Sequence, residues 1–349
     1  MRESLPTASI VVPCFNAART VGRCVDACLG QDYPYLEIVF VDDGSSDSTL
    51  AVLEAYEHIT VIAQENKGPA SARNLGWRSS TGEIICFTDS DCVPNPTWVS
   101  QLIEGYTDAC IGAVGGGYDI ANPESWLARC IHEEIRQRHL RMPRQVNYLG
   151  SFNVSYTRSV LEQTGGFDER FRRASAEDND LSYRVIKQGY TLVFDRANCV
   201  AHHHTEGLWS YMRQQFWHGY WRIGLYIKQP DTIGGDEYVG VFEFLQLPLS
   251  LLTAMAWAFS WTSSAILALA LMLSGLLVGG QIPMTWSMME TTGDVRYFPY
   301  LLVMAVRAFF RGLGMLRGVV GSSIMELTSL ASALVGAVLG NRKARGQAP

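Results

Sequence analysis

Two pairs of aspartates come directly after short apolar segments of the sequence. Asp42 and Asp43 follow one such segment, and Asp89 and Asp91 follow the run Ile-Ile-Cys-Phe at 84–87. Two carboxylates separated by one residue can share a hard cation, which typically keeps several waters and also binds substrate phosphates. The first pair can accept hydrogen bonds from a ribose or a base, or it can form a turn whose side chains bond their own backbone. The second pair therefore predicts a cation and phosphate site.

Three consecutive histidines, His202, His203 and His204, follow a strand predicted at 191–194 and its turn. An imidazole can be a further metal ligand beside two carboxylates, or it can neutralise a leaving phosphate. On an extended segment neighbouring side chains point to opposite faces, so at most His202 and His204 share a face. We expect one of these two, with His202 favoured, to face the metal. Ordinary loop histidines are the alternative.

Alternating apolar and amphipathic segments predict the elements that position these residues. Residues 8–12 are rich in Val and Ile and predict a buried strand, and residues 18–29 have helical spacing. The pattern repeats, with strands predicted at 36–41, 60–63, 83–88 and 112–118 and helices at 48–57, 69–79 and 97–106. This order predicts an α/β fold with a mostly parallel, doubly wound sheet covered on both faces. Ligands bind such sheets at the carboxyl ends of the strands, where both aspartate pairs lie.

Two later helices are predicted beyond this sheet. Residues 125–145 combine an apolar side with five arginines. They form either a solvated surface helix or a helix beside anionic headgroups or an acceptor phosphate. Residues 178–188 form the other helix, which ends at Gly189.

Further motifs occur in a fixed order around the aspartate pairs. They are Val-Val-Pro-Cys-Phe-Asn at 11–16, Asn-Lys-Gly-Pro-Ala-Ser-Ala-Arg-Asn at 66–74, Gly-Gly-Phe-Asp-Glu at 165–169 and Glu-Asp-Asn-Asp-Leu at 177–181. With these motifs the chain resembles the family 2 glycosyltransferases of the GT-A fold. The resemblance covers about residues 8–225.

The resemblance implies inverting transfer of a sugar from a nucleotide diphosphate sugar. By the family pattern, Asp89 and Asp91 bind the metal–diphosphate, with Mg²⁺ or Mn²⁺ as the cation and His202 as a further ligand. The residues implied to bind the nucleotide sugar are Pro13, Phe15, Asp43, Arg73 and Asp89. Asn153 lies where such enzymes often line the sugar pocket, although a plain turn residue fits this position equally well.

Inversion needs a base that removes the proton of the acceptor hydroxyl as it attacks the anomeric carbon. Glu177-Asp178 matches the family's Glu-Asp motif, so the resemblance implies Asp178 as the base, with Glu177 beside it. The segment from Ser175 to Asp178 also has the pattern of a capping box, with acids favoured in the first turn of the helix. Both interpretations predict a carboxylate at the start of this helix.

Residues 213–219 occupy the place where processive members of the family carry Gln-x-x-Arg-Trp. Here Trp217-His218 follows Gln214 at that spacing, so the Arg-Trp pair is missing and a non-processive enzyme is expected. Gln214, Gln215 and Trp217 are candidates for acceptor contacts. Trp217 also fits an interfacial aromatic helix.

The charges divide the chain into two parts. Residues 1–240 have a net charge of −9 and residues 241–349 a net charge of +3, with no Asp, Glu, Lys or Arg from Phe244 to Met289. An acidic front part argues against nucleic acid as the partner, because phosphate binding needs a basic face. The eight cysteines are irregularly spaced and predict buried, reduced thiols, although Cys24 and Cys28 could form a metal pair.

The uncharged run exceeds the roughly 20 residues that cross a bilayer once. Two helices at about 244–260 and 264–280, joined by a polar turn that includes Trp261, fit a transmembrane hairpin. A buried hairpin of a soluble protein is the alternative. The chain therefore predicts a catalytic domain over 1–240 and a membrane region over 241–349.

An interfacial helix is predicted at about 300–318, because Arg307, Arg311 and Arg317 form one polar stripe and an arginine in mid-bilayer is costly. The basic tail 341–349 favours a cytosolic C-terminus. The first residues lack a long apolar segment, so no signal peptide is expected and the catalytic domain is predicted to face the cytosol. Together these features predict a multi-pass protein of the cytoplasmic (inner) membrane, with the lipid bilayer as a partner.

Three classes of function are compatible with a fold of this kind. The first is a transferase that uses a membrane-proximal acceptor, either lipid-linked or a polyprenyl phosphate, for a cell-envelope polysaccharide. The second is a nucleotidyltransferase, whose usual Gly-rich, Arg-containing loop after the first strand is absent here. The third is a catalytically degenerate membrane scaffold, which the presence of both Asp89 and Asp91 and of the Glu177-Asp178 pair argues against. The first class is favoured.

Overall fold

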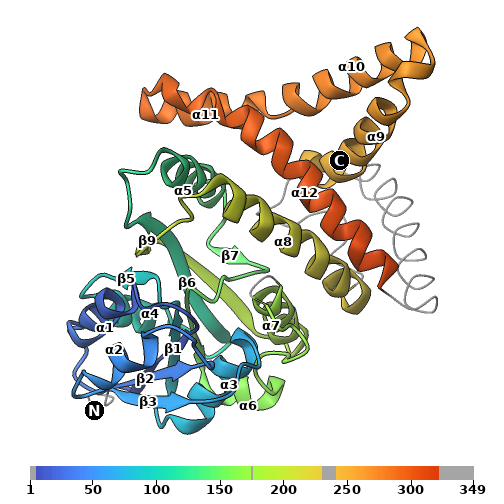
Figure 1. Ribbon diagram of the computed structural model, residues 1–349. Coiled ribbons are helices and arrows are strands. Elements are labelled where there is room, and N and C mark those ends of the chain that lie inside the picture. The colour runs from blue at the N-terminus through green and yellow to red at the C-terminus, as the bar shows by residue number, and fades with distance from the viewer. Residues whose placement is uncertain (1–4, 174–175, 230–240, 322–349) are drawn as a thin grey trace, which may run out of the picture. The chain divides into compact units, whose positions relative to one another are not determined.

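The structure is a computed structural model that describes residues 5–173, 176–229 and 241–321 (Figure 1). Contacts within the chain divide it into two compact units between His204 and Thr205. The sequence places a boundary later, at 240. The difference is helix α8 (Leu208–Lys228), which packs along α12 (Tyr300–Val320) and therefore groups with the C-terminal helices.

The front unit alternates strands and helices as the apolar pattern predicts. The strands are β1 (Ala8–Cys14), β2 (Leu36–Asp42), β3 (Thr60–Ala63), β4 (Ile84–Thr88), β5 (Cys92–Pro94), β6 (Ile111–Ile120), β7 (Gln145–Val146), β8 (Asn153–Thr157) and β9 (Thr191–His202). The helices are α1 (Val21–Leu29), α2 (Thr49–Glu54), α3 (Pro69–Ser79), α4 (Trp98–Glu104), α5 (Trp126–His139), α6 (Arg158–Thr164) and α7 (Glu177–Lys187).

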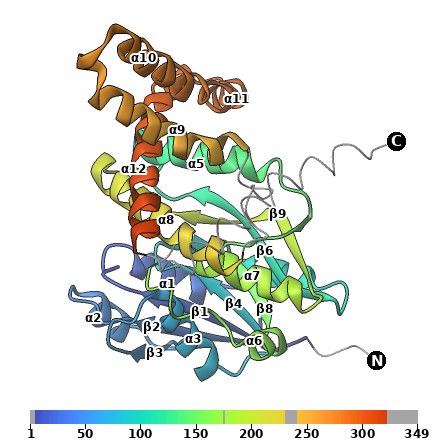
Figure 2. The same ribbon diagram turned by 90° about the vertical axis from the view of Figure 1, so that its right-hand side faces the viewer.

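Among the described residues these strands form one sheet in the order β3-β2-β1-β4-β8-β6-β9-β5, with β7 added on β9. The first four run parallel, side by side, as Figure 2 shows. Strand β8 is antiparallel to both β4 and β6, and β9 returns to a parallel pairing with β6. The sheet is therefore mixed rather than mostly parallel. Strands β5, β7 and β8 are not predicted from the sequence, because such short strands carry little periodic signal.

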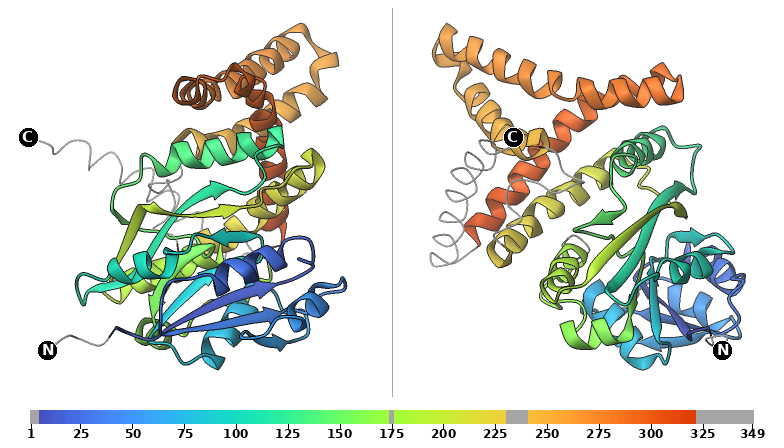
Figure 3. Two further views of the ribbon diagram at one scale, coloured as in Figure 1. Left: turned by 90° about the vertical axis from the view of Figure 1, so that its left-hand side faces the viewer. Right: turned by 180° about the vertical axis from the view of Figure 1, so that it is seen from behind.

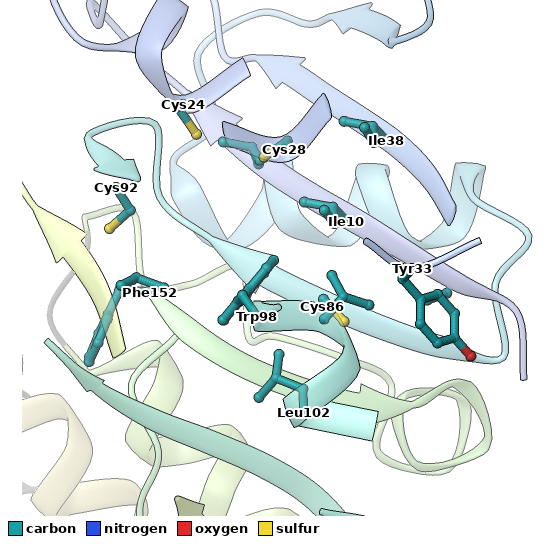
Figure 4. Packing of buried hydrophobic residues seen from close by; sticks show 14 of the residues in the cluster. Ile10, Cys24, Cys28, Tyr33, Ile38, Cys86, Cys92, Trp98, Leu102 and Phe152 are labelled. Carbon is teal, nitrogen blue, oxygen red and sulfur yellow. The ribbon is translucent and has the colours of Figure 1, made fainter. Parts of the chain in front are cut away.

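Side chains of the parallel strands alternate between two packed faces. Ile10 and Phe40 point into a core shared with α1 and α4, where Trp98 and Leu102 pack near Cys86 (Figure 4). On the opposite face the strands pack against α3, and a Cβ on Gly76 would overlap the side chain of Val11. Burial on both faces explains the continuous Val/Ile runs of these strands.

The cysteines support the prediction of reduced, buried thiols. All eight are free, and six of them are buried. Cys24 and Cys28 lie in the main core, where Cys24 contacts the backbone oxygen of Asp89 at 3.5 Å. Cys110 is exposed and Cys199 is half-buried. The pair at 24 and 28 is thus part of the packing around β1 and β4.

Two of the five arginines of the predicted basic side are paired with glutamates within α5. Arg136 pairs with Glu133 at 2.8 Å and Arg138 with Glu134 at 2.5 Å, and both glutamates are buried. The sequence shows these arginines but does not show which acidic side chains pair with them. Arg141 and Arg144, just after the helix, are exposed, so a smaller basic surface remains than the five arginines alone suggest.

The C-terminal unit is helical. Its elements are α8, α9 (Val241–Ala258), the short turn η2 (Ser260–Thr262), α10 (Ser264–Gly279), α11 (Ile282–Thr292), η3 (Val295–Tyr297) and α12, seen from two further sides in Figure 3. Helices α9 and α10 form the predicted hairpin and turn at the predicted place. Two helical segments, Ser264–Thr292 and Val295–Val320, are long and apolar enough to cross a membrane, and Leu245–Ala258 is apolar but shorter. The tail at 341–349 lies outside the described residues.

The arginine stripe of α12 packs differently from the prediction. Arg307 is buried and donates a hydrogen bond to the Tyr211 hydroxyl at 2.9 Å, and Arg311 donates to Gln215 Oε1 at 2.6 Å. Both partners lie on α8, about 96 residues earlier in the chain. Arg317 is exposed. Two of the three arginines thus have polar partners in the protein instead of facing headgroups.

Candidate active site

The predicted metal-binding aspartates lie in a short loop between β4 and β5. Strand β4 ends at Thr88 and β5 begins at Cys92, whose N–H donates to the Asp89 backbone oxygen at 2.9 Å. The Thr88 hydroxyl donates to the Phe152 carbonyl at 2.8 Å and fixes the end of β4. The loop therefore holds Asp89 and Asp91 at the carboxyl end of a strand, as the sequence predicts.

Asp91 meets His202 because β5 pairs with β9. In this antiparallel pair Cys92 lies opposite His202, and the His203 N–H donates to the Asp91 backbone oxygen at 2.9 Å. His202 Nε2 then lies 3.4 Å from Asp91 Oδ1. Strand β9 is longer than the predicted 191–194 and reaches His202, so this histidine belongs to the sheet and not to a loop.

The two groups shift each other's protonation. Burial opposes charge on both, but the imidazole beside Asp91 lowers the pKa of that carboxyl, and the carboxylate raises the pKa of His202. Donor atoms of Asp91, Cys92 and His202 lie within 4.8 Å of one another. The carboxylate of Asp91 suits Mg²⁺ or Mn²⁺, and the imidazole of His202 is a donor that divalent first-row cations accept, whereas the Cys92 thiol suits softer metals.

Asp89 points to a different partner. Its Oδ1 accepts from the Nη2 of Arg73 at 2.7 Å, while Nη1 of the same guanidinium donates to Glu177 Oε1 at 2.9 Å. Arg73 and Glu177 are both almost completely buried, and the guanidinium also lies 5.5 Å from the centroid of the Phe167 ring. Burial alone would lower the pKa of Arg73, but the two carboxylates raise it. Arg73 thus joins the aspartate loop to the start of α7.

Replacing Arg73 should have a large effect on stability. Loss of one partner from a buried ion pair costs about 3–5 kcal/mol, and here Arg73→Met would leave Asp89 and Glu177 without their cation. Arg73→Lys keeps the charge, but a single ammonium cannot reproduce the two-pronged contact, so we expect an intermediate loss and roughly tenfold lower activity. Denaturant unfolding and turnover would be measured together. Arg78→Lys, on the same helix and half-exposed, is the matched control and should change neither; an equal loss there would contradict this role for Arg73.

Asp178 is placed on the first turn of α7, next to this ion-pair network. It is only partly buried, and its Oδ1 accepts from the Asn179 N–H at 2.8 Å. Burial and the neighbouring Glu177 raise the pKa of Asp178 to about 7, partly offset by hydrogen bonds and Arg73. A carboxylate with this pKa can accept a proton near neutral pH. Ser175, the first residue of the alternative capping box, lies outside the described residues.

Asp43 is held by the chain itself. Its Oδ1 accepts from the Lys67 N–H at 2.9 Å and the Gln64 side chain at 2.6 Å, and its Oδ2 accepts from the Gly68 N–H at 2.8 Å. Pro13 is buried in β1, whereas Phe15, just after this strand, is 51% exposed. Among the residues predicted to contact the nucleoside, Phe15 therefore has an exposed ring. The carboxylate of Asp43 instead fixes the loop before α3.

Asn153 has a structural position. It is fully buried in β8; its Oδ1 accepts from the Trp98 indole at 2.8 Å, and its Nδ2 donates to the backbone oxygens of Gly117 and Asn198. These contacts bind three parts of the sheet and α4 together. The sequence-based candidate for a sugar-pocket residue is instead an internal connector, which a single sequence could not reveal because all three partners are distant along the chain.

An aromatic cluster that the sequence does not predict lies behind His202. The Tyr118 ring stacks on Phe152 at 3.5 Å between centroids, and it makes T-shaped contacts with His202 at 4.9 Å and His204 at 5.5 Å. His132 packs 5.7 Å from His204. Burial and the neighbouring histidines lower the pKa of His204 to about 2, so this ring is neutral at physiological pH. His204 therefore lies behind His202 and not beside Asp91.

The candidate acceptor residues all lie on α8, in the C-terminal unit. Gln214 is exposed, and its Oε1 accepts from the Thr205 hydroxyl at 3.4 Å. Gln215 is buried and bonds Arg311, and Trp217 is half-buried, with its ring 5.5 Å from Tyr220. Gln215 is thus engaged in helix packing, and Gln214 has the most exposed side chain of the three.

The sequence of the front unit matches a known family. The model of the family "Glycosyl transferase family 2" matches residues 9–164. Residues 9–164 form a family 2 glycosyl transferase domain. This match covers the aspartate loop and α3 with Arg73, and it ends before α7.

Individual relatives extend further along the chain. Glycosyltransferase AglE of Haloferax volcanii is 27% identical over 202 residues, which are 56% of this chain and 66% of AglE. Glucosyl-dolichyl phosphate glucuronosyltransferase of the same organism is 26% identical over 239 residues, 61% of this chain and 75% of that protein. The chain spans only 58–66% of the length of several of its curated relatives.

A solved structure shares the fold. The mannosyltransferase PcManGT from Pyrobaculum calidifontis, in complex with GDP-Man and Mn²⁺, superposes with a TM-score of 0.60 over 92% of this chain and 89% of its own, at 20% identity. The family 2 domain of this chain thus has the GT-A fold, a mixed α/β sheet, as the motifs imply.

Proposed function

We propose that this glycosyl transferase moves a hexose from a nucleotide diphosphate sugar to an acceptor at the membrane surface, one residue at a time and with inversion at the anomeric carbon. The observation that carries the proposal is the pair of ion bridges from Arg73 to Asp89 and Glu177. They hold the aspartate loop and the start of α7 together although these are about 90 residues apart in sequence. This contact supports one site for the proposed diphosphate-binding group and the proposed base.

The proposed cation ligands are Asp89, Asp91 and His202, with Mg²⁺ or Mn²⁺ as the ion. When bound, such a cation neutralises charge on the departing diphosphate. The supporting observations are the 3.4 Å approach of His202 to Asp91 and the partial exposure of both aspartates. The mannosyltransferase of the same fold is described with Mn²⁺ and GDP-Man, which is consistent with this choice of ion and donor class.

Asp178 is the proposed base, and Glu177 and Arg73 position it. Asp178 removes the proton of the acceptor hydroxyl as the oxygen attacks from the face opposite the diphosphate. Its raised pKa makes it a sufficient base at neutral pH while still letting it release the proton afterwards. Phe15 and the loop fixed by Asp43 are proposed to bind the nucleoside, and Gln214 the acceptor.

The acceptor is proposed to be lipid-linked or a polyprenyl phosphate, as for a cell-envelope polysaccharide. Two apolar helical segments follow the catalytic part, and one relative is named for a glucosyl-dolichyl phosphate acceptor. To test the function, the purified full chain would be incubated with Mn²⁺ or Mg²⁺ and a panel of nucleotide sugars, with and without polyprenyl phosphate. Release of nucleoside diphosphate from one donor, stimulated by the lipid, is expected. No release from any donor, with either cation, would reject the proposal.

For the topology we propose a cytosolic catalytic part up to about residue 240, followed by a multi-pass region of the cytoplasmic membrane. Ser263→Cys, in the exposed turn between α9 and α10, should react with an impermeant thiol reagent added to intact cells. Cys110, the exposed native thiol of the front unit, should react only after lysis. Mass spectrometry of the labelled peptides distinguishes the two sites. Labelling of Cys110 from outside, or protection of Ser263→Cys, would contradict this arrangement.

A further inference from the structure

The structure points to a role for His204 that the motifs do not assign. We propose that His204 is a positioning residue: its Nδ1 accepts the Nδ1 proton of His202, which leaves the Nε2 lone pair of His202 for the cation. The inference rests on the proposed function, because it takes His202 as a metal ligand.

The rings of His202 and His204 are within hydrogen-bonding distance of each other. His202 Nδ1 and His204 Nδ1 are 3.0 Å apart, and the other nitrogen of His202, Nε2, is the atom that approaches Asp91. A neutral imidazole has one N–H and one lone pair. If Nε2 binds a cation through its lone pair, the proton must be on Nδ1, and the atom opposite must accept it. That atom is Nδ1 of His204.

The position of His204 is fixed from its backbone. Asn122 Oδ1 accepts from the His204 N–H at 3.0 Å, and Asn122 Nδ2 donates to the His204 carbonyl at 2.8 Å. The side chain is 2% exposed and packs against Tyr118 and His132. Within the part of the chain that the structure describes, His204 Nε2 has no hydrogen-bond partner. Nδ1 is therefore the hydrogen-bonding nitrogen of this ring, and it points at His202.

A neutral acceptor suits this place better than a charged one. Metal-bound histidines usually donate their second N–H to a carboxylate, a backbone carbonyl or water. A further carboxylate here would add negative charge next to Asp89 and Asp91, where a diphosphate must also bind. An imidazole orients His202 without changing the charge of the site, and its burial keeps water from competing for the Nδ1 proton.

Two substitutions separate hydrogen bonding from packing. In His204→Asn the amide Oδ1 occupies nearly the place of Nδ1 and accepts the same proton, whereas His204→Leu fills the space without an acceptor. Mn²⁺ affinity of the full chain, without donor, would be followed by the electron paramagnetic resonance of free Mn²⁺. We expect His204→Leu to weaken Mn²⁺ binding by about 10–100-fold, and His204→Asn to stay within about threefold of wild type. His204→Ala is the second variant without an acceptor, should the Leu variant unfold.

The controls distinguish this inference from the proposed function. His139→Leu alters the same aromatic cluster, in which its ring stacks 6.1 Å from Tyr118, and should leave Mn²⁺ affinity unchanged. If His204→Leu and His204→Ala bind Mn²⁺ like wild type, or if His204→Asn loses as much as His204→Leu, the positioning role is wrong. His202→Ala tests the ligand itself: wild-type affinity in that variant would overturn the metal site and the inference together.

Discussion

Asp91→Asn should abolish sugar transfer, with a loss of about a thousandfold or more, or about 4 kcal/mol of transition-state stabilisation. The asparagine keeps the size of the side chain but removes the charge that pairs with His202 and is proposed to hold the cation. Diphosphate release and Mn²⁺ affinity would be measured on the same preparation, and both should fall. The loss comes from the carboxylate, because Asp91 is partly exposed and carries little of the packing.

A matched substitution gives the baseline for this result. Glu104→Gln removes one exposed carboxylate from the end of α4, away from the aspartate loop, and should leave transfer and Mn²⁺ affinity unchanged. Full activity of an Asp89/Asp91 double variant in excess chelator would contradict the metal site. In that case Asp89 would serve as an ion-pair partner of Arg73 and not as a metal ligand.

Asp178→Asn should reduce turnover by about a hundredfold or more while leaving donor affinity nearly intact. The amide preserves the shape of the side chain and its contacts at the start of α7 but cannot accept a proton. The variant should also melt close to wild type, since Asp178 forms no ion pair with any residue that the structure describes. Normal turnover combined with a lower melting temperature would favour the capping interpretation instead.

Asp180→Asn is the contrasting variant on the same helix. Asp180 is fully buried and pairs with Arg184 at 2.8 Å. Removing one partner of such a pair costs about 3–5 kcal/mol, so this variant should be markedly less stable. The turnover of its folded fraction should stay near wild type. The two neighbouring acids would then separate catalysis from stability.

The raised pKa of Asp178 also predicts the pH dependence of wild-type transfer. The base must be ionised to accept the acceptor proton, so kcat/KM should fall as the pH drops below about 7 and level off above it. Asp178→Asn should lose this acidic limb. A profile that is flat from about pH 5 to 9 would exclude a base with this pKa.

The parallel strands and the aspartate loop could be predicted from the sequence because their signals are local. The Val/Ile runs of β1 and β2 reflect burial on both faces, and Asp89 and Asp91 directly follow such a run. The Glu177-Asp178 motif was also found, since the start of α7 is marked by three acids. In these cases the residue type and its neighbours in the sequence are enough to predict the element or the site.

Other features depend on partners far along the chain. The resemblance places Arg73 near the nucleobase or diphosphate of the donor. Its contacts to Asp89 and Glu177, however, depend on how α7 folds back onto the sheet. Asn153 could not be separated from a turn residue, because its partners come from α4, β6 and β9. The arginines of α12 have partners on α8 for the same reason. Pairings of this kind have no periodic signature in a single sequence.

The anomeric configuration of the product tests most directly whether the sugar is transferred with inversion in a single displacement. With the donor identified by the nucleotide-sugar panel, proton nuclear magnetic resonance would follow the anomeric signal during the first turnovers, before mutarotation or further transfer. Attack by an acceptor oxygen that Asp178 deprotonates, on the face opposite the diphosphate, predicts a β-linked product from an α-linked donor. A first product that keeps the α configuration would contradict the single-displacement mechanism and the role of Asp178 as its base.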